Sequence, residues 1–411
     1  MRIASGWAYG CVGVALGVML TVGAAGCAAF PGATSSEATE GSMEDIVRQA
    51  ADSVGISQED VAIVVDGRVF TQQDVDRYVK QSRAILGFSD DEAYSDYLEG
   101  AGISSWDFRK QVMRTLIRNT LIKSDADEHG VTVDDATVQA YIGRLEERYP
   151  SRSAWLQALS NSGYTEESYT TTVRLDLLSK ALKDAVITAP ELTEEQIQQY
   201  AVMVAPTLAG RRSSHILFSN DDFETAVDVY QRLLDGADFA EMAREYSIDG
   251  TGANGGDVGW DSVGNFVSDY ESALRKLEPG EMSPVVKSQF GYHIILCTEK
   301  YEPTYLDDGT IDLSSIPDDL MDIIKASMSE SLEDQMFNTY LSNLEATATL
   351  AAFDENGNQV SPDELGLSTE EIPLDGDTSS DEAIDDVIDP NVDNDVDSVV
   401  STSKGAVSLA G

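Results

Sequence analysis

Two of the three histidines in this 411-residue chain have the same kind of sequence environment. His215 precedes Ile216-Leu217-Phe218, and His293 precedes Ile294-Ile295-Leu296. Short apolar runs of this kind predict strands of a half-buried sheet, and rigid strands can fix two imidazole rings against each other. These histidines are therefore the first candidates for chemistry.

The segments around the two histidines contain further motifs in a fixed order. They are Ser214-His-Ile-Leu217, Gly236-Ala-Asp-Phe-Ala-Glu-Met-Ala243, Gly255-Gly-Asp-Val-Gly-Trp260, Leu277-Glu-Pro-Gly-Glu-Met-Ser-Pro284 and Phe290-Gly-Tyr-His-Ile-Ile295. Several separated motifs in the right order are a more specific signal than one short pattern. On these motifs, the stretch from Arg212 to Tyr301 resembles a parvulin-type peptidyl-prolyl cis/trans isomerase domain.

The resemblance implies a set of site residues. His215 and His293 match the histidine pair whose rings hydrogen-bond across the floor of the parvulin site. Asp249 matches a position that is Asp in many members and Cys in others, which argues against an obligatory thiol nucleophile. The pocket for the proline ring maps to Val258, Phe266, Tyr270 and Phe290, with the Ser288 hydroxyl nearby. No metal or other cofactor is implied. Judged by spacing alone, Phe266, Tyr270 and Phe290 would be core residues, and a histidine on an apolar strand is usually a satisfied core group; only the resemblance favours the site.

Such an enzyme breaks no covalent bond of its substrate. The barrier to peptide-bond rotation is about 18–20 kcal/mol, and it falls if the site binds the twisted amide better than either planar form. The loop after the first strand begins Ser219-Asn-Asp-Asp-Phe-Glu224. Because these carboxylates would repel phosphoserine, ordinary X-Pro segments are the expected substrates.

Charge and cysteine usage exclude other classes. The formal net charge of −46 predicts a surface that repels phosphate, so no nucleic-acid partner is expected. Only Cys297 lies in the expected folded part, which leaves no intradomain disulfide and no support for a structural zinc site.

The N-terminal sequence indicates that the protein is exported. An apolar run from Ala8 to Ala25 ends in Ala24-Ala-Gly-Cys27, which looks like the lipobox of a bacterial lipoprotein signal. Residues 1–26 would then be the signal peptide, and Cys27 would carry the lipid that holds the protein at the outer face of the cytoplasmic membrane. An ordinary signal peptide or a short anchor is the alternative.

The rest of the chain predicts an α+β protein in several parts. Residues 27–57 are expected to be a flexible tether, 58–205 a helical domain with a small hairpin, 210–302 the parvulin domain, 303–350 a helical segment packing on the N-terminal domain, and 351–411 a disordered acidic tail. The hairpin is expected around Asp66-Gly67, followed by a helix capped by Thr71, and Thr165 is expected to cap a later helix from Tyr169 to Leu182. This order of parts resembles that of extracytoplasmic foldases of the PrsA and SurA type. The resemblance is looser outside the isomerase domain.

Three functions remain open. The first is an active isomerase that helps unfolded exported polypeptides with X-Pro bonds to fold. The second is a non-catalytic holdase, in which the helical module binds clients and the parvulin domain is a peptide-binding scaffold. The third is an anchored interaction protein that uses its acidic tail. The sequence leaves the oligomeric state open, a homodimer included.

Overall fold

The computed structural model describes residues 42–88, 90–264 and 266–373. These residues form two compact units, one containing 42–188 and 333–373 and the other 189–332. The first is mostly helical and the second has a small antiparallel sheet flanked by helices, which confirms the expected α+β class. Within the described ranges, no helix combines the length and the apolar character needed to cross a membrane.

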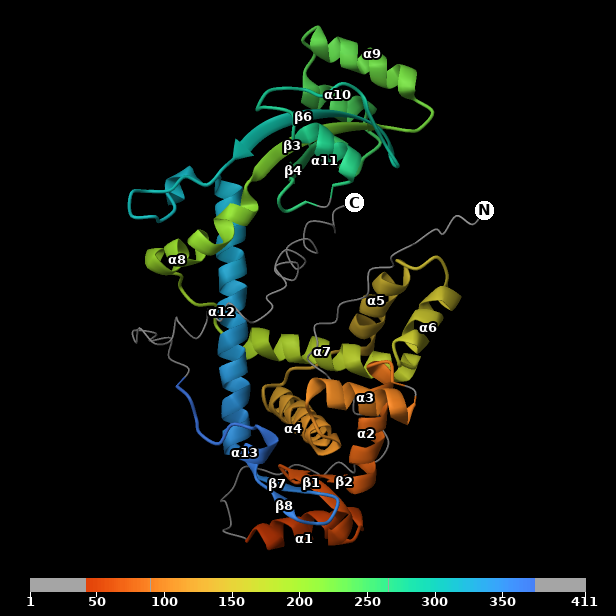
Figure 1. The fold of residues 1–411 in the computed structure, drawn as a ribbon, viewed down its shortest axis with the longest axis vertical. Coiled ribbons are helices and arrows are strands. Elements are labelled where there is room, and N and C mark those ends of the chain that lie inside the picture. The colour runs from red at the N-terminus through yellow and green to blue at the C-terminus, as the bar shows by residue number, and fades with distance from the viewer. Residues whose placement is uncertain (1–41, 89, 265, 374–411) are drawn as a thin grey trace. The chain divides into compact units, whose positions relative to one another are not determined.

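The first unit is built on a four-stranded antiparallel sheet with the order β2-β1-β7-β8. Strands β1 (Val61–Val65) and β2 (Arg68–Thr71) form the expected hairpin, whose turn residues Asp66 and Gly67 both have positive φ. Strands β7 (Leu350–Phe353) and β8 (Gln359–Val360) come from the far end of the chain. Figure 1 shows α1 (Met43–Val54) on one side of this sheet and α2 (Gln72–Ile85) on the other.

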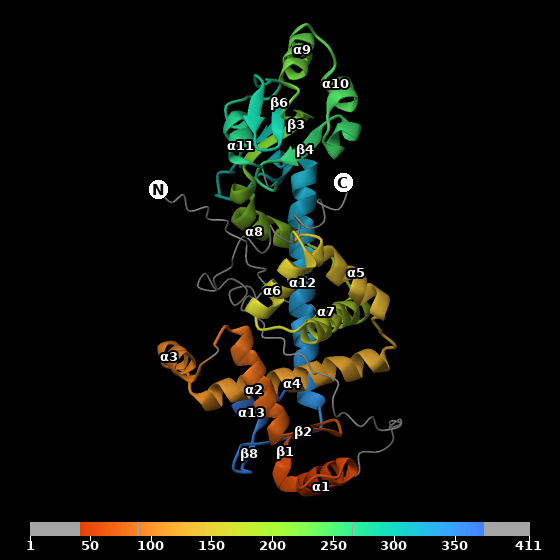
Figure 2. The same cartoon turned by 90° about the vertical axis from the view of Figure 1, so that its right-hand side faces the viewer.

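Helices make up the remainder of the first unit: α3 (Asp91–Ala101), α4 (Ser105–Glu128), α5 (Asp135–Glu146), α6 (Arg152–Asn161), α7 (Glu166–Val186) and the short α13 (Pro362–Leu365). The expected caps are present, since Thr71 begins α2 with a capping box and Thr165 begins α7 in the same way. Figure 2 gives a second view of α4, whose buried face contributes to the core shared with α2 and β1.

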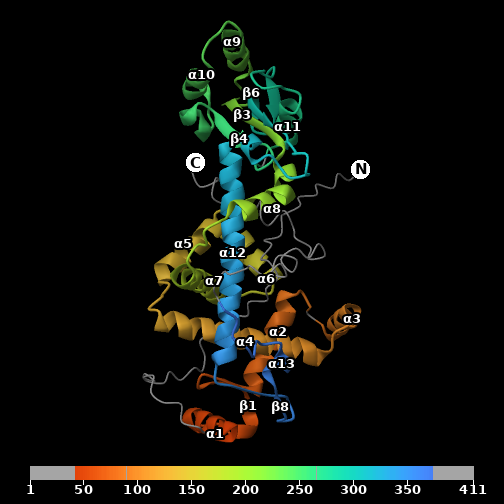
Figure 3. The ribbon, with the colours of Figure 1, turned by 90° about the vertical axis from the view of Figure 1, so that its left-hand side faces the viewer.

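The second unit holds an antiparallel sheet with the order β4-β3-β6-β5. Its strands are β3 (Gly210–Phe218), β4 (Asp257–Trp260), β5 (Val286–Ser288) and β6 (Gly291–Tyr301), and its helices are α8 (Glu194–Val204), α9 (Phe223–Leu234), α10 (Phe239–Tyr246) and α11 (Ser268–Leu274). Helices α9 and α10 cover the face that carries Ile216 and Ile294, and α11 covers the face that carries Ile295. Figure 3 shows α10 and α11 on opposite sides of the sheet.

Helix α12 (Asp318–Thr347) belongs to both units. Its apolar residues at four-residue steps, Leu320 to Leu344, do not share one partner. In the second unit Leu320 and Ile324 pack with residues of α8 and with Trp260, whereas in the first unit Tyr340 and Leu344 pack against the cluster formed by α4 and α7. A step of four residues advances about 40° around an α-helix, so such a stripe winds around the helix and changes direction along its length.

Three expected boundaries differ from the structure. The tether was expected to extend to residue 57, but residues 43–54 form α1; the tail was expected to begin at 351, but β7, β8 and α13 are ordered. Helix α8, expected within the N-terminal domain, packs in the second unit. The expected signal peptide, Cys27, residues 28–41 of the tether and residues 374–411 of the tail lie outside the described residues.

Candidate active site

The register of β3 and β6 brings His215 and His293 together. His215 pairs with Ile295, and Leu217 pairs with His293. Side chains alternate between the two faces of a sheet, so the two histidines are diagonal neighbours on one face. Their Nδ1 atoms are 3.3 Å apart, and the rings are stacked with centroids separated by 5.4 Å. Only 7% of His215 and 3% of His293 is exposed to solvent.

The two imidazoles are part of a longer series of polar contacts, here called the polar line, that comprises Asp249, His215, His293 and Ser288. Asp249 Oδ1 lies 3.5 Å from His215 Nε2, and Ser288 Oγ lies 2.7 Å from His293 Nε2. The backbone N–H of Phe290 donates to Ser288 Oγ over 3.1 Å. The polar line thus joins His215 of β3 and His293 of β6 with Asp249 from a loop and Ser288 from the end of β5.

Donor and acceptor roles on this path depend on the tautomers of the two rings, and one assignment gives each contact a donor and an acceptor. An ionised Asp249 can only accept, so His215 carries its proton on Nε2 and accepts at Nδ1. His293 must then donate from Nδ1, which leaves its Nε2 to accept from the Ser288 hydroxyl. Both rings are neutral in this arrangement, and every contact has one donor and one acceptor. The distance of 3.5 Å is long for a hydrogen bond, so the buried His215 Nε2 is the weakest point of the line.

The pKa values agree with two neutral rings. Burial lowers the pKa of His215, although the charge of Asp249 opposes this effect. Burial and the adjacent His215 lower the pKa of His293 to about 4. Burial by itself raises the pKa of Asp249, but hydrogen bonds from Thr251 and the contact with His215 bring it below its ordinary value. At neutral pH the site therefore contains two neutral imidazoles and one carboxylate.

The loop that carries Asp249 is fixed to β3. The N–H of Ile248 donates to the Leu217 carbonyl over 2.9 Å, and the Leu217 N–H donates to Ser247 Oγ over 3.1 Å. Asp249 also caps a 3-10 helix (Gly250–Asn254) by accepting from the Thr251 backbone and hydroxyl. The carboxylate thus has a structural role besides its contact with the histidine.

An apolar cluster adjoins the histidines on the same face of the sheet. Tyr270 from α11 is 2% exposed, and its ring stands edge-on to both imidazoles at centroid distances of 5.7 and 5.5 Å. Phe266 stacks on Tyr270 at 4.9 Å, and Val258 packs in the same cluster. Phe290 differs from these three residues, because it is 58% exposed and stands outside the cluster. Of the residues assigned to the proline pocket, the structure groups three.

Some residues at this site could not be inferred from the sequence. Ser213 is completely buried, and its Oγ lies 3.1 Å from the Tyr270 hydroxyl. Thr251 anchors Asp249. A serine in a strand and a threonine in a loop have no distinctive spacing, so neither gave a signal.

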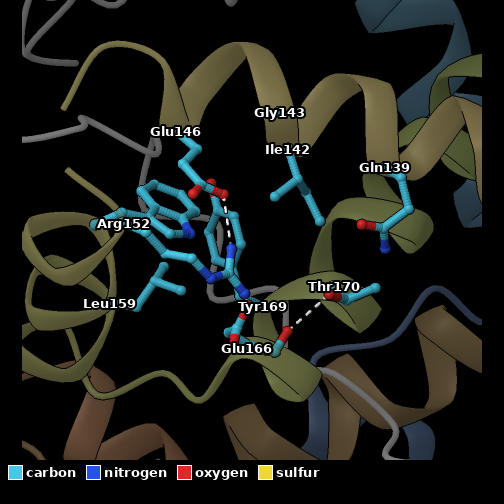
Figure 4. A pocket seen from close by; sticks show the side chains of 10 residues that line it. Gln139, Ile142, Gly143, Glu146, Arg152, Leu159, Glu166, Tyr169 and Thr170 are labelled. Atoms are coloured by element: carbon cyan, nitrogen blue, oxygen red, sulfur yellow. Dashed lines mark hydrogen bonds and ion pairs between the residues drawn. The ribbon is translucent and has the colours of Figure 1, made fainter.

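The first unit has a cleft of its own between α5, α6 and α7, with a volume of ≈150 Å³ (Figure 4). Arg152 lines the cleft and bonds to Glu146 and Glu166. Trp155 lines the cleft but is only 3% exposed and packs edge-on against Tyr169. Trp155 therefore belongs to the core of the first unit and offers little surface to a client.

Two family models match the chain. The model of the PPIC-type PPIase domain matches residues 215–299, which span both histidines, Asp249 and the apolar cluster. The model of the SurA-like N-terminal domain matches residues 46–183, which lie in the first unit. The two matched regions therefore correspond to the two parts that the sequence distinguished.

Curated relatives match more than half of the chain. Foldase protein PrsA of Caldanaerobacter subterraneus subsp. tengcongensis is 34% identical over 243 residues, which are 57% of this chain and 72% of that protein. Foldase protein PrsA of Geobacillus kaustophilus is 34% identical over 212 residues, 51% of this chain and 66% of that protein. The crystal structure of PrsA from Bacillus subtilis is 21% identical, with a TM-score of 0.35, and the match covers 70% of this chain and 93% of that chain. The chain therefore belongs to the family of PrsA foldases, and its second unit carries a parvulin-type peptidyl-prolyl cis/trans isomerase domain.

Proposed function

We propose that the protein is a lipid-anchored foldase of the outer face of the cytoplasmic membrane, and that its second unit accelerates X-Pro rotation at the polar line without a covalent intermediate. The observation that carries this proposal is the pair of neutral imidazoles beside the cluster of Val258, Phe266 and Tyr270. A proline ring is apolar and its amide is polar, so a site for it needs both kinds of surface side by side.

The proposed mechanism is preferential binding of the twisted amide. As the bond rotates, resonance between nitrogen and carbonyl is lost. A site that binds this twisted form more tightly than either planar form lowers the barrier to rotation. The polar line is fixed in advance by β3, β6 and the loop at Asp249, so its dipoles need not reorganise during the reaction. In this proposal His215, Asp249 and His293 are the catalytic residues, and the apolar cluster with Ser288 and Phe290 binds the substrate.

Position 249 is an aspartate and not a cysteine, which supports non-covalent chemistry. Cys297 is fully buried, and burial raises the pKa of its thiol, so it is a poor nucleophile. It lies on β6, in the apolar cluster under α11. A thiol-blocking reagent is therefore expected to leave the isomerase rate unchanged.

A protease-free isomerase assay on the full chain tests this proposal. Exchange between the cis and trans forms of an X-Pro peptide can be followed by NMR, and catalysis predicts faster exchange than in buffer. His293→Ala should abolish most of the acceleration, whereas His129→Ala, in the other unit, should retain it. No acceleration by the wild-type chain would refute the catalytic proposal and leave the peptide-binding alternative.

The proposed clients are unfolded exported polypeptides that contain X-Pro bonds. This assignment rests on the family of the chain and on the lipobox-like Ala24-Ala-Gly-Cys27. The net charge of −46 keeps such a protein soluble at high local concentration and disfavours nucleic-acid ligands.

A holdase function is the second candidate, because of the match to the SurA-like N-terminal domain. Chaperone SurA of Burkholderia orbicola is 29% identical over 160 residues, which are 37% of this chain and 33% of that protein. A holdase would suppress aggregation of an unfolded client equally well with His293→Ala as with the wild-type chain. Loss of suppression in that variant would assign the effect to the isomerase site instead.

A further inference from the structure

Arg212 of β3 joins three carboxylates close to His215. Its Nη2 lies 2.7 Å from Asp257 Oδ2, and its Nη1 lies 2.6 Å from Asp319 Oδ2 and 3.6 Å from Glu299 Oε1. Burial by itself raises the pKa of Asp257, but the hydrogen bond from Arg212 brings it below its ordinary value. At neutral pH Asp257 is therefore a carboxylate held by the guanidinium, which stands on the same strand as His215.

Asp257 is the residue through which this ion pair reaches the histidine. The His215 N–H donates over 2.7 Å to the carbonyl of Gly256, which directly precedes Asp257. The register of β3 and β4 shifts between Ser213 and Ser214, next to His215, so the ladder is locally interrupted here. The ion pair at Asp257 therefore supplies the fixed point for the Gly256 carbonyl.

A second carboxylate of the cluster comes from outside the parvulin domain. Asp319 lies in the first turn of α12, whereas the region matched to the PPIC-type PPIase domain ends at residue 299. Asp319 Oδ2 accepts from Arg212 Nη1 and also from Trp260 Nε1, the latter over 2.8 Å. Arg212 and Trp260 are paired residues of β3 and β4. One carboxylate of α12 thus holds both strands of the interrupted ladder.

We propose that Arg212 and Asp319 are positioning residues of the isomerase. Through the neighbouring ion pair they hold the Gly256 carbonyl, and with it the His215 backbone, in place. This inference rests on the proposed isomerase function. The polar line is sensitive to such positioning, because Asp249 Oδ1 and His215 Nε2 are already 3.5 Å apart, and catalytic groups must be held within about 0.5 Å of their productive geometry. The isomerase of this chain therefore depends on α12 for its full rate.

Asp319→Asn in the full chain tests the inference. Asparagine keeps the size of the side chain and an oxygen for Trp260, but it loses the charge that pairs with Arg212. NMR exchange over a range of X-Pro peptide concentrations should give an unchanged KM and a kcat roughly tenfold below that of the wild-type chain, a smaller loss than the about 100-fold that a misplacement by about 1 Å can cause. Asp318→Asn is the matched control, because it removes the same charge from the same helix turn at an exposed position. It should keep the wild-type kcat.

The backbone N–H signal of His215 in NMR spectra distinguishes positioning from a general loss of stability. Asp319→Asn should shift this signal, because the hydrogen bond to the Gly256 carbonyl changes, and Asp318→Asn should leave it in place. If Asp319→Asn does not fold, Arg212→Lys replaces it, since an ammonium keeps the charge but lacks the planar fork that holds two carboxylates. The same loss of kcat and the same shift are then expected.

Three results would each overturn the inference and leave the isomerase function intact. They are an unchanged kcat, an unchanged His215 signal, and an equal loss of kcat in Asp318→Asn. If the wild-type chain accelerates no peptide, the proposed function fails instead, and the His215 signal still decides whether Asp319 positions this residue.

Discussion

Ser288 Oγ lies 2.7 Å from His293 Nε2, at the end of the polar line opposite Asp249, and with both rings neutral in the tautomers assigned above it is the donor. This hydroxyl is the partner that keeps the buried Nε2 satisfied while Nδ1 donates to His215. Because the proton positions along the line depend on one another, a change at Ser288 is expected to reach the histidine pair.

Ser288→Ala is expected to lower kcat/KM about tenfold, since an unsatisfied buried nitrogen costs about 1–3 kcal/mol. Ser288→Thr keeps the hydroxyl and should retain most of the rate. Both variants are compared with the wild-type chain by NMR exchange on one X-Pro peptide. An alanine variant as fast as the wild type would show that the hydroxyl has no part in catalysis.

The stability of the second unit should depend on pH through His293. Its pKa falls from 6.5 to about 4 on folding, so between these values the unfolded chain binds the proton more readily. The resulting stability is fully present above pH 6.5 and is lost as the pH falls toward 4. The free energy of unfolding should therefore drop by about 2 to 3 kcal/mol between pH 7 and pH 4.5 from this group.

Urea unfolding at the two pH values measures this loss. Carboxylates also titrate in the window, so the comparison is with His293→Asn, which lacks the titrating ring and should show a smaller decrease. An equal decrease in the wild-type chain and in the variant would contradict the assignment.

Gly256 is expected to be indispensable for the position of His215. It has a φ of 83°, and a Cβ atom there would lie 2.2 Å from the His215 carbonyl oxygen. Gly256→Ala should therefore displace β3 at the histidine and reduce both stability and kcat/KM. Gly259 is the matched control, since its φ is 76° but a Cβ would have nothing within 4 Å.

Gly259→Ala should lose about 1–2 kcal/mol from the left-handed conformation alone and keep its activity. Thermal unfolding and the isomerase rate are measured for both variants. Equal effects of the two substitutions would show that backbone conformation, and not the close approach to His215, explains the requirement for glycine.

The buried Ser213 and Tyr270 hydroxyls should be coupled energetically. Ser213→Ala or Tyr270→Phe alone leaves the other hydroxyl buried without its partner, at a cost of about 1–3 kcal/mol. The double variant removes both groups and should cost less than the sum of the two single changes. Urea unfolding of the four proteins gives the coupling energy, and additive effects would refute a coupled pair.

Lipid attachment is predicted at Cys27. Cells that express the wild-type chain should incorporate labelled palmitate into the protein, and Cys27→Ala should abolish this labelling and release the protein from the membrane fraction. Cys11→Ala is the control, since Cys11 lies within the apolar run that precedes the lipobox. Continued labelling of Cys27→Ala would refute the lipoprotein assignment.

The sequence predicted local features well. The resemblance to parvulin-type isomerases is confirmed, because its motifs are short segments whose identity does not depend on distant contacts. The hairpin at Asp66-Gly67 and the caps at Thr71 and Thr165 were also predicted, since turns and helix ends are determined by a few adjacent residues.

Two ordered segments were missed for different reasons. Helix α1 has a capping box of Ser42 and Asp45, so a sequence signal existed, but the neighbouring small polar residues concealed it. Strand β7 is short and is followed by an acidic segment, and its pairing with β1 joins residues far apart in the chain. Pairing of this kind depends on tertiary context and has no local signature. The histidine pair stays a proposal as a catalytic group, although the register now explains how the strands bring the rings together.

The strand order β2-β1-β7-β8 imposes a sequence of events on biosynthesis. Every residue of the isomerase unit is synthesised before β7 and, in an exported chain, also crosses the membrane before it. The edge of β1 that pairs with β7 therefore stays unpaired while the isomerase unit can already fold. An open edge is a site of aggregation, and contacts between distant residues form slowly. A chain that ends after Leu332 would thus contain all residues of the isomerase unit, together with a first unit whose sheet lacks β7 and β8.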